Sequence, residues 1–450
     1  MARYPMNRLQ VSGHRFLRRR LERALVDGDV GRAGDPPRPQ PVSLVVGAGA
    51  AVLAVAGCAV LGWLRPQPGL GDAAIVMDQA SGALYVRVED TVHPVLNLTS
   101  ARLIAQAADD PRHVTAADLG DAKRGALLGI PGAPATVGPA LSAAESGWTA
   151  CDGAETTVVA GPVRPASQAE PVLVTGRSGT TYLLYDGKRA AVDLTDLATV
   201  RALHLDGVEP RPASPAVLSL LSEVPPISAP SIPDAGLPGP SALPGFVIGD
   251  VVRVEHAEAT EYFVVLAGGV QRVGVVAADV IHSATSRPGT EITTVAAAAI
   301  DGVPTLGVLP VTDFPERIDS PRGRDVPVVC ASWAAGAASV SAGDGLPLDA
   351  QHAAVSLAQA DGDGPAVDAV YVPPGHSAYV RSSGLAASTG SVVADTGVRF
   401  PIGDAEAARV LGLPEHPEPA PWSLLALLPS GPELRRDAAL VARDVLAPTP

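Results

Sequence analysis

The amino-acid sequence predicts a single-pass membrane protein with a mixed α+β, β-rich exported region. Three observations predict this class: an uncharged apolar run, a basic segment in front of it, and four similar stretches behind it. The 44 prolines and 46 glycines favour many turns and short strands over long helices. We expect the exported region to be elongated, with a central domain and four small β-hairpin/helix repeats in a pseudo-twofold arrangement.

The apolar run from Val42 to Leu64 is interpreted as the membrane anchor. It carries no charge, and a helix of this length, rising about 1.5 Å per residue, spans a hydrocarbon core of about 30 Å. Trp63 and Arg65 suit the membrane interface, and Pro66 ends the helix. A secretory signal peptide is the alternative, but its apolar region is shorter, about 7 to 15 residues, and lies nearer the N-terminus.

The charges on either side of the anchor predict its orientation. Residues 1–40 carry nine arginines and four acidic residues, a balance of +5, so the remainder of a chain with net charge −14 sums to −19. Basic flanks stay on the cytoplasmic side of membranes. We therefore expect an inner (plasma) membrane protein with a cytoplasmic N-terminus and a periplasmic C-terminal region. The acidic exterior argues against nucleic acid as a partner.

The cytoplasmic tail is expected to form a basic amphipathic helix from about Asn7 to Val26. Its apolar residues recur near the helical period, with arginines between them. The helix would contact either the anionic lipid of the inner leaflet or a cytoplasmic partner; a charge cluster that only sets topology is the alternative. The residues expected to make the contact are Arg15, Phe16, Arg18, Arg19, Arg20 and Leu21. A stiff spacer, 36–41, leads to the membrane.

Internal repetition is the main feature of the exported region. Four stretches share a tyrosine, a strand, a polar turn, a second strand and an Ala-rich helix. They are 83–104, 181–203, 261–281 and a looser fourth copy, 378–384 and 397–413, which is interrupted by an insertion of small residues. The shared tyrosines are Tyr85, Tyr182, Tyr262 and Tyr379. Thr99, Thr195 and Asp404 are expected to cap the helices. One such unit buries little apolar area alone, so the repeats should pack on each other or on a shared core.

A proline-rich stretch, 225–249, separates the second and third copies and is interpreted as a linker. The predicted division is a tail, 1–41; a transmembrane helix, 42–64; repeat 1, 72–134; the first part of the central domain, 135–170; repeat 2, 171–224; the linker, 225–249; repeat 3, 250–299; the second part of the central domain, 300–367; repeat 4, 368–425; and a C-terminal segment, 426–450.

The three cysteines divide by compartment. Cys58 lies in the apolar run, whereas Cys151 and Cys330 fall outside the membrane, where disulfides form and persist. We expect these two to pair, with two unpaired buried thiols as the alternative. Trp148 and Trp333 lie close in sequence to the two cysteines and are expected to pack against the disulfide rather than to bind sugar.

No motif for chemistry emerges from the sequence. A phosphate-binding loop needs G-x-x-x-x-G-K-[ST], and neither lysine, Lys123 or Lys188, has that context. No nucleophile elbow, HExxH helix or Cys/His cluster occurs. We therefore expect no catalytic residue, no metal and no cofactor, and we lean against an enzyme.

Several motifs, taken in order, resemble one family. They are VSGHRFLRRRLERALVDGD (11–29), a single span, LNLTSARLI (96–104), RGALLGIPGAP (124–134), WTACDG (148–153) and VVCASW (328–333). Together they are similar to EccB, the membrane component B of the actinobacterial type VII (ESX) secretion system. The resemblance covers nearly the whole chain.

The resemblance implies a structural subunit of the inner-membrane core complex, which scaffolds the exported side of the channel. It implies four repeat modules around a central domain and a disulfide between Cys151 and Cys330. The implied partners are an EccC-like motor ATPase, EccD-like and EccE-like membrane subunits, the mycosin protease and further copies of the chain. Two alternatives stay open: a membrane anchor that binds the peptidoglycan cell wall, and an ATPase, as the family is often labelled.

Overall fold

The computed structural model describes residues 8–27, 40–64, 70–120, 122–163, 170–256, 259–285, 290–349, 351–383 and 390–443. The chain divides into two compact units, Met1–Gly69 and Leu70–Pro450. Residues 36–39 of the expected spacer 36–41, and Arg65 and Pro66, lie outside the described residues. The last two residues of that spacer, Gln40 and Pro41, begin a helix and are not extended as expected.

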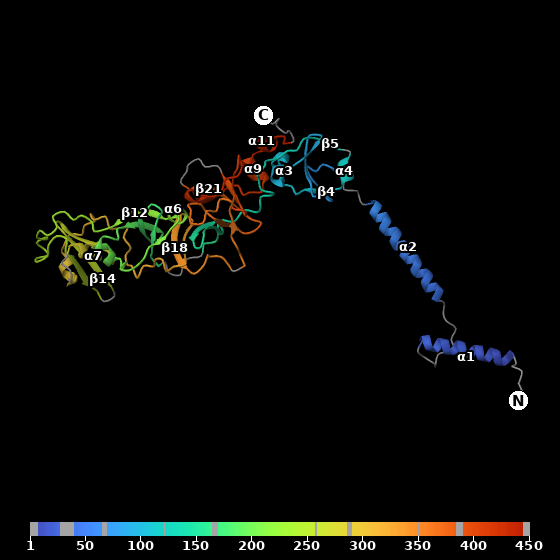
Figure 1. The fold of residues 1–450 in the computed structure, drawn as a ribbon, viewed down its shortest axis with the longest axis horizontal. Helices are drawn as coiled ribbons and strands as arrows, with labels where there is room; N and C mark the ends of the chain where they lie inside the picture. The colour runs from blue at the N-terminus through green and yellow to red at the C-terminus, as the bar shows by residue number, and fades with distance from the viewer. Residues whose placement is uncertain are drawn as a thin grey trace. The chain divides into compact units, whose positions relative to one another are not determined.

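The first unit contains two helices, α1 (Arg8–Asp27) and α2 (Gln40–Leu64), drawn in blue in Figure 1. Helix α2 includes the backbone of Val42 and Leu64, and its described side chains, 44–60, are all exposed. Within the described part of the chain, no helix combines the length and the apolar character that a membrane crossing requires.

The second unit is mixed and β-rich, as the sequence predicts, and its four smaller sheets share one plan. Three consecutive strands pair antiparallel, a helix follows, and the next strand returns to pair parallel with the first. The first two sheets add a fifth strand, which pairs parallel with the third. Small modules of this kind cannot bury a core alone, so they pack on one another.

The bounds of the elements follow the chain. The first sheet has β1 (Ile75–Asp78), β2 (Leu84–Val88), β3 (Thr91–Pro94), α3 (Leu98–Ala105), β4 (Arg112–Val114), α4 (Ala116–Gly120) and β5 (Lys123–Arg124). The second has β8 (Val172–Thr175), β9 (Thr181–Tyr185), β10 (Lys188–Val192), α5 (Leu197–Ala202), β11 (Arg211–Pro212), α6 (Pro215–Leu220) and β12 (Ser222–Ile227).

The third sheet has β13 (Val251–Glu255), β14 (Thr260–Leu266), β15 (Gly269–Val273), α7 (Val275–Thr285), β16 (Thr293–Val295) and, after it, α8 (Ala297–Asp301). The fourth has β21 (Ser377–Ser383), β22 (Ser391–Ala394), β23 (Arg399–Pro401), α9 (Ala405–Val410) and β24 (Glu418–Pro421), followed by α10 (Trp422–Leu425) and α11 (Arg436–Ala439).

A six-stranded sheet lies between these modules, in the order β18-β17-β6-β7-β20-β19. It combines strands from distant parts of the chain: β6 (Gly147–Asp152), β7 (Thr156–Gly161), β17 (Val328–Ala334), β18 (Ala337–Gly343), β19 (Val355–Ser356) and β20 (Ala369–Tyr371). Strands β6 and β7 are buried along their whole length.

The cores of the second unit join neighbouring modules. One core combines the six-stranded sheet with the second and fourth sheets, α6 and α10. A second core joins the first and fourth sheets and includes the contact of α3 with α9. A third joins the second and third sheets through α5 and α7. Side chains from the proline-rich stretch 225–249 pack on the cores of the third sheet, among them Leu243 and Phe246.

The expected position of the tyrosine in the fourth repeat is corrected. The first three tyrosines lie on the second strand of their sheets, but Tyr379 lies on the first strand, β21, opposite Val392. The strand that corresponds to the other tyrosines is β22, beyond the Ser- and Gly-rich stretch that follows β21. Matching the copies by their tyrosines therefore shifted the fourth copy by one strand.

The helix caps differ from the expectation at two of three positions. Asn97 caps α3 by accepting from Ser100 N at 2.8 Å, and Asp196 caps α5 by accepting from Ala198 N at 3.0 Å. Thr99 lies inside α3, and Thr195 precedes the cap of α5. Asp404 caps α9, as predicted. Asn and Asp side chains generally cap helices better than threonine, which explains why Asn97 and Asp196 are the caps and not Thr99 and Thr195.

The turn between β9 and β10 gives a first testable prediction. Gly187 has φ +72°, and a Cβ added there would lie 2.1 Å from the Ala338 carbonyl oxygen of β18. We expect Gly187→Ala to cost about 1–2 kcal/mol of unfolding free energy from the left-handed backbone and about 1–3 kcal/mol more from the clash. Urea unfolding of the full chain would measure both costs together.

Gly179 provides the matched control. It has φ +83°, but no atom lies within 4 Å of the position that an added Cβ would take. Gly179→Ala should therefore show the backbone cost without the clash. Equal losses in the two variants would contradict the close packing of the β9–β10 turn against β18.

Candidate functional site

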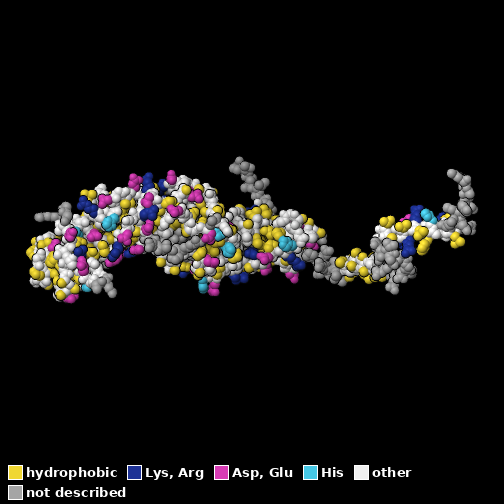
Figure 2. All heavy atoms as spheres, turned by 90° about the horizontal axis from the view of Figure 1, so that it is seen from below, with side chains coloured by type: hydrophobic (Ala, Val, Ile, Leu, Met, Phe, Trp, Pro, Cys, Tyr) yellow, Lys and Arg dark blue, Asp and Glu magenta, His cyan; other side chains and the backbone are white. Residues whose placement is uncertain are grey.

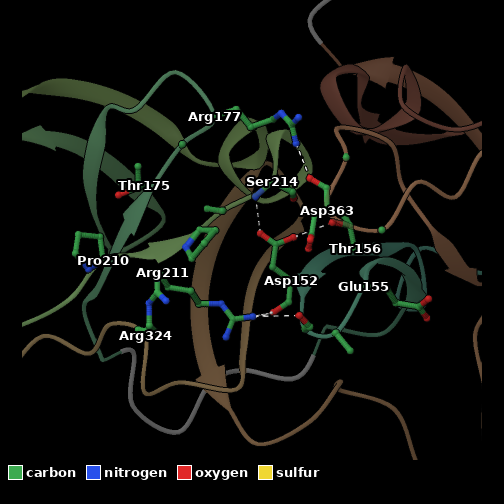
Figure 3. A pocket seen from close by; sticks show the side chains of 17 residues that line it. Asp152, Glu155, Thr156, Thr175, Arg177, Pro210, Arg211, Ser214, Arg324 and Asp363 are labelled. Atoms are coloured by element: carbon green, nitrogen blue, oxygen red, sulfur yellow. Dashed lines mark hydrogen bonds between the residues drawn. The ribbon is translucent and has the colours of Figure 1, made fainter.

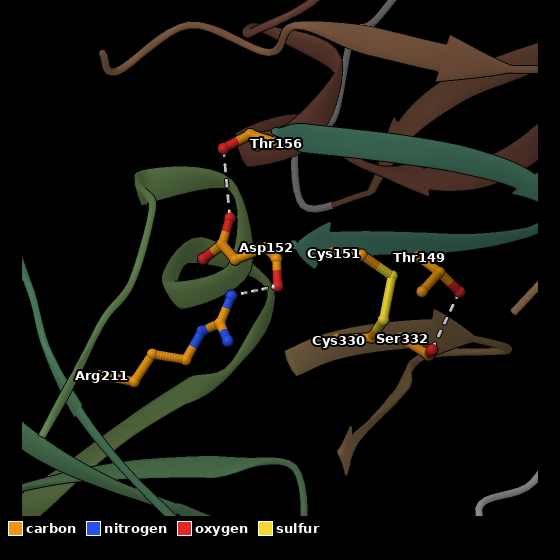
Figure 4. Close-up of a disulfide and its surroundings, with 7 residues drawn as sticks. All are labelled: Thr149, Cys151, Asp152, Thr156, Arg211, Cys330 and Ser332. Atoms are coloured by element: carbon orange, nitrogen blue, oxygen red, sulfur yellow. Dashed lines mark hydrogen bonds between the residues drawn. A yellow bond between two sulfur atoms is a disulfide. The ribbon is translucent and has the colours of Figure 1, made fainter. Parts of the chain in front are cut away.

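The disulfide lies in the six-stranded sheet, where β6 and β17 pair antiparallel. Cys151 and Cys330 are direct partners across these strands, and their sulfur atoms are bonded, as the sequence led us to expect (Figure 4). Val328 and Leu346 pack around the bond. Cys58 lies exposed in α2, outside this pair.

The two tryptophans lie on the other face of the same strands. Trp148 and Trp333 are partners in the β6–β17 register, and Trp148 is 0% exposed in the core that joins the second and fourth sheets. Side chains alternate between faces along a strand, so residues three positions from each cysteine point away from the disulfide. The expectation that the tryptophans pack against the disulfide is therefore wrong.

Arg211, at the start of β11, holds the two cysteine-bearing strands together. Its Nη2 donates to the carbonyl oxygens of Asp152 at 2.8 Å and Gly153 at 3.3 Å, which follow Cys151. Its Nη1 donates to the carbonyl oxygens of Val326 and, at 2.7 Å, Pro327, which precede β17. One guanidinium from the second sheet therefore contacts both sides of the disulfide-linked pair.

The Asp152 carboxylate makes further contacts at the same place, and the contacts of Arg211 and Asp152 together are here called the joint. Its Oδ2 accepts from Ser214 N at 2.7 Å, and its Oδ1 accepts from Thr156 Oγ1 at 3.2 Å. Ser214 is the N-cap residue of α6, so the carboxylate links the β6–β7 turn to the second sheet. Burial raises the pKa of Asp152 above its ordinary value, and burial lowers the pKa of Arg211, while the attraction between the two charges opposes both shifts.

The raised pKa of Asp152 predicts a pH effect. A carboxyl with a raised folded-state pKa stabilises the fold most when protonated, below the ordinary aspartate value of about 3.9, and loses that contribution as the pH rises through its folded-state pKa. Asp152→Asn cannot ionise. We therefore expect the unfolding free energy of the variant to rise relative to wild type between pH 4 and neutrality, measured by urea unfolding. The prediction would be contradicted if the unfolding free energy of the variant minus that of wild type stays constant or falls as the pH rises.

A cavity of about 720 Å³ lies beside this joint (Figure 3). Its walls come from the β6–β7 turn, from two segments of the second sheet, from Arg324 and from the loop 362–364. Arg177 reaches across it and donates to the Asp363 carbonyl oxygen at 2.7 Å. The joint and the cavity therefore share the β6–β7 turn and the second sheet, and Arg324 and the loop 362–364 supply the remaining walls of the cavity.

The contact residues expected in the tail all lie on α1. Arg15, Phe16, Arg18, Arg19, Arg20 and Leu21 are exposed. Arg18 forms an ion pair with Glu22 at 3.0 Å, and Phe16 and Leu21 are 64% and 63% exposed. In Figure 2, basic and hydrophobic side chains of this helix are visible at the surface. The helix thus presents both classes of group that a lipid or protein partner would contact.

Lys188, which follows a glycine as the lysine of a phosphate-binding loop does, forms an ion pair within the fold. Its Nζ lies 3.0 Å from Asp313 Oδ1, and the hydroxyl of Tyr185 donates to the Asp313 carbonyl oxygen at 2.6 Å. In the described part of the chain, no group of three or more His, Cys, Asp or Glu side chains could hold a metal ion. Sequence reasoning missed Arg211, Asp152 and Asp313, since their partners lie far along the chain.

The similarity of the chain to known proteins extends over nearly its whole length. A family described as "Type VII secretion system ESX-1, transport TM domain B" matches residues 3–448. The chain is 35% identical over 484 residues to the ESX-3 secretion system ATPase EccB3 of Mycolicibacterium smegmatis, covering 99% of this chain and 92% of that protein. It is 32% identical over 477 residues to the ESX-5 secretion system ATPase EccB5 of Mycobacterium tuberculosis, covering 98% and 94%.

Solved structures give the same result. The chain matches a chain of an intact ESX-5 inner membrane complex with a TM-score of 0.71 and 30% identity, covering 99% of this chain and 97% of that chain. It matches the EccB3 dimer from the ESX-3 core complex with a TM-score of 0.71 and 31% identity, covering 82% of this chain and 100% of that chain.

Proposed function

The chain belongs to the EccB family of type VII (ESX) secretion systems, and on this premise we propose that it is a structural subunit of an ESX inner-membrane core complex, where it scaffolds the exported side of the channel. One observation carries this function: nearly the whole chain matches a subunit of an intact ESX-5 inner membrane complex. The match includes the first unit as well as the second, because it covers 99% of the chain.

We propose a single membrane crossing by residues 42–64, with the N-terminus in the cytoplasm. The uncharged run and the +5 balance of residues 1–40 support this orientation. The second unit then lies in the periplasm, where its disulfide can persist.

We propose that α1 contacts a cytoplasmic partner or the inner leaflet. Exposed Phe16 and Leu21 offer apolar area for such a contact. Basic side chains beside anionic lipid contribute about 1 kcal/mol each. The same helix can therefore serve either partner.

The four smaller sheets are proposed to be repeated modules in a pseudo-twofold arrangement about the six-stranded sheet. Their shared strand plan and the two helix pairs, α3 with α9 and α5 with α7, support this proposal. In that arrangement the first and fourth modules form one end of the second unit, and the second and third form the other.

The proposed partners are an EccC-like motor ATPase, EccD-like and EccE-like membrane subunits, the mycosin protease and further copies of the chain. Purification of the tagged full chain from native membranes in mild detergent tests this set. We expect the motor ATPase and a multispanning subunit to co-purify. A matched purification of a variant lacking residues 8–27 shows which partners need α1. Recovery of the chain alone, or with unrelated proteins, would contradict the function.

Catalysis of ATP hydrolysis is not part of the proposed function, although the relatives are named ATPases. Lys188 follows a tight turn, and its ion pair with Asp313 links the second sheet to the segment after α8. We expect the purified full chain to show no ATP turnover above a buffer blank and Lys188→Ala to leave that value unchanged. Turnover that the substitution abolishes would refute a purely structural role.

A further inference from the structure

The cavity beside Arg211, here called the joint cavity, has the size of a ligand site. Its volume of about 720 Å³ falls within the range of about 300–1,000 Å³ that is typical of such sites. The joint already described forms one side of it. Arg211 is engaged by four carbonyl oxygens, and both oxygens of Asp152 accept hydrogen bonds. Most polar groups on that side are therefore occupied, whereas the buried Arg211 Nε has no hydrogen-bond partner among the described residues.

Two other arginines at the joint cavity retain donors. Arg177 donates through Nη1 to the Asp363 carbonyl, and among the described residues its Nε and Nη2 have no acceptor. Arg324 pairs through Nε with Glu209 at 3.5 Å, with both side chains mostly exposed. Exposed pairs of this kind are weak. Both guanidinium groups can thus receive a carboxylate, which matches the arginine fork with two parallel hydrogen bonds.

Two carboxylates also line the joint cavity. Among the described residues, no group donates a hydrogen bond to the side-chain carboxylate of Glu155 or of Asp363. The two carboxylates would repel a small anion, and such an anion has no donor group to hydrogen-bond with them. A peptide uses both kinds of group, because its acidic side chain pairs with an arginine while its backbone N–H groups donate to carboxylates. Pro210 and Pro212 add rigid apolar wall against which such a chain can lie.

We propose that the joint cavity binds an extended peptide segment that carries an acidic side chain, presented by a partner protein. This goes beyond the scaffold function, because it assigns a specific recognition site to the contact between the second sheet and the six-stranded sheet. Binding would depend on Arg177 and Arg324, and on the joint that shapes the wall.

Fluorescence anisotropy with the full chain in detergent micelles tests the proposal. The probe is a fluorescein-labelled Gly-Glu-Gly-Glu-Gly peptide, and its glutamine twin and free glutarate serve as competitors. We expect saturable binding of the probe, displacement by unlabelled probe, and weak displacement by the twin or by glutarate. Each of Arg177→Gln and Arg324→Gln should weaken binding about tenfold, the usual effect of losing a charge-assisted hydrogen bond.

Arg201→Gln is the matched control. Arg201 is an exposed arginine on α5 of the same unit, away from the residues that line the joint cavity. It should bind the probe as wild type does. Absence of saturable binding, or equal losses in all three variants, would overturn the proposal. Glutarate that competes as well as the peptide would overturn the assignment to a peptide.

Discussion

Simultaneous replacement of Cys151 and Cys330 by serine is expected to lower the free energy of unfolding of the second unit by about 3–5 kcal/mol. The bond closes a loop with a sequence separation of 179 residues, and a crosslink over a loop of that length removes much of the entropy of the unfolded chain. Both cysteines are also buried, in the middle of the sheet that joins the modules. Urea unfolding followed by tryptophan fluorescence is a suitable measurement, because Trp148 and Trp333 lie on the same strands.

Cys58→Ser supplies the control for this experiment. Cys58 is exposed in α2 and takes no part in the disulfide, so the substitution should leave the unfolding curve of the second unit unchanged. Addition of a reductant to the wild type should reproduce the effect of the double replacement. A wild-type curve that is insensitive to reductant, with both thiols found reactive, would show that the bond does not form.

Arg211→Met is expected to cost about 2–4 kcal/mol of unfolding free energy. Methionine keeps much of the side chain's apolar volume but removes the donors to four carbonyl oxygens. It also removes the positive charge that offsets the buried Asp152 carboxylate. Breaking such buried, charge-assisted contacts from one side leaves unpaired acceptors, which is the costly case. Arg201→Met, at an exposed position on α5, should change stability little.

A double-mutant cycle extends this prediction. Arg211 contacts the backbone on both sides of the disulfide, so the two features stabilise the same strand pair. We expect the combined loss in the triple variant to differ from the sum of the separate losses by about 0.5–3 kcal/mol. Strict additivity would show that Arg211 and the disulfide act independently.

Local patterns in the sequence predicted the parts of the fold that depend on neighbouring residues. One example is the polar turn expected between the two strands of the stretch 181–203, which is formed by Asp186 and Gly187. Another is the cap at Asp404, which lies where the sequence indicated. The pairing of Cys151 with Cys330 was also predictable, from their number and compartment rather than from their spacing. The alternation of a strand could have placed the tryptophans correctly, since each lies three residues from its cysteine.

The joint around Arg211 could not be predicted from the sequence. Its contacts to Asp152 and Pro327 span 59 and 116 residues, and no motif of fixed spacing joins them. The acceptors are backbone carbonyls, which every residue carries, so residue types give no signal. The register of the fourth sheet was misplaced for a related reason, because a shared tyrosine is weaker evidence than the pairing of whole strands.

Imaging of the tagged chain within its native complex tests the central claim most directly. We propose a structural subunit with one membrane crossing and a disulfide-stabilised exported unit. Electron cryomicroscopy of the complex purified through this chain is predicted to show one helix per copy in the membrane and the second unit on the exported side, in contact with further membrane subunits. A chain found apart from any membrane assembly, or with the second unit on the cytoplasmic side, would contradict the account.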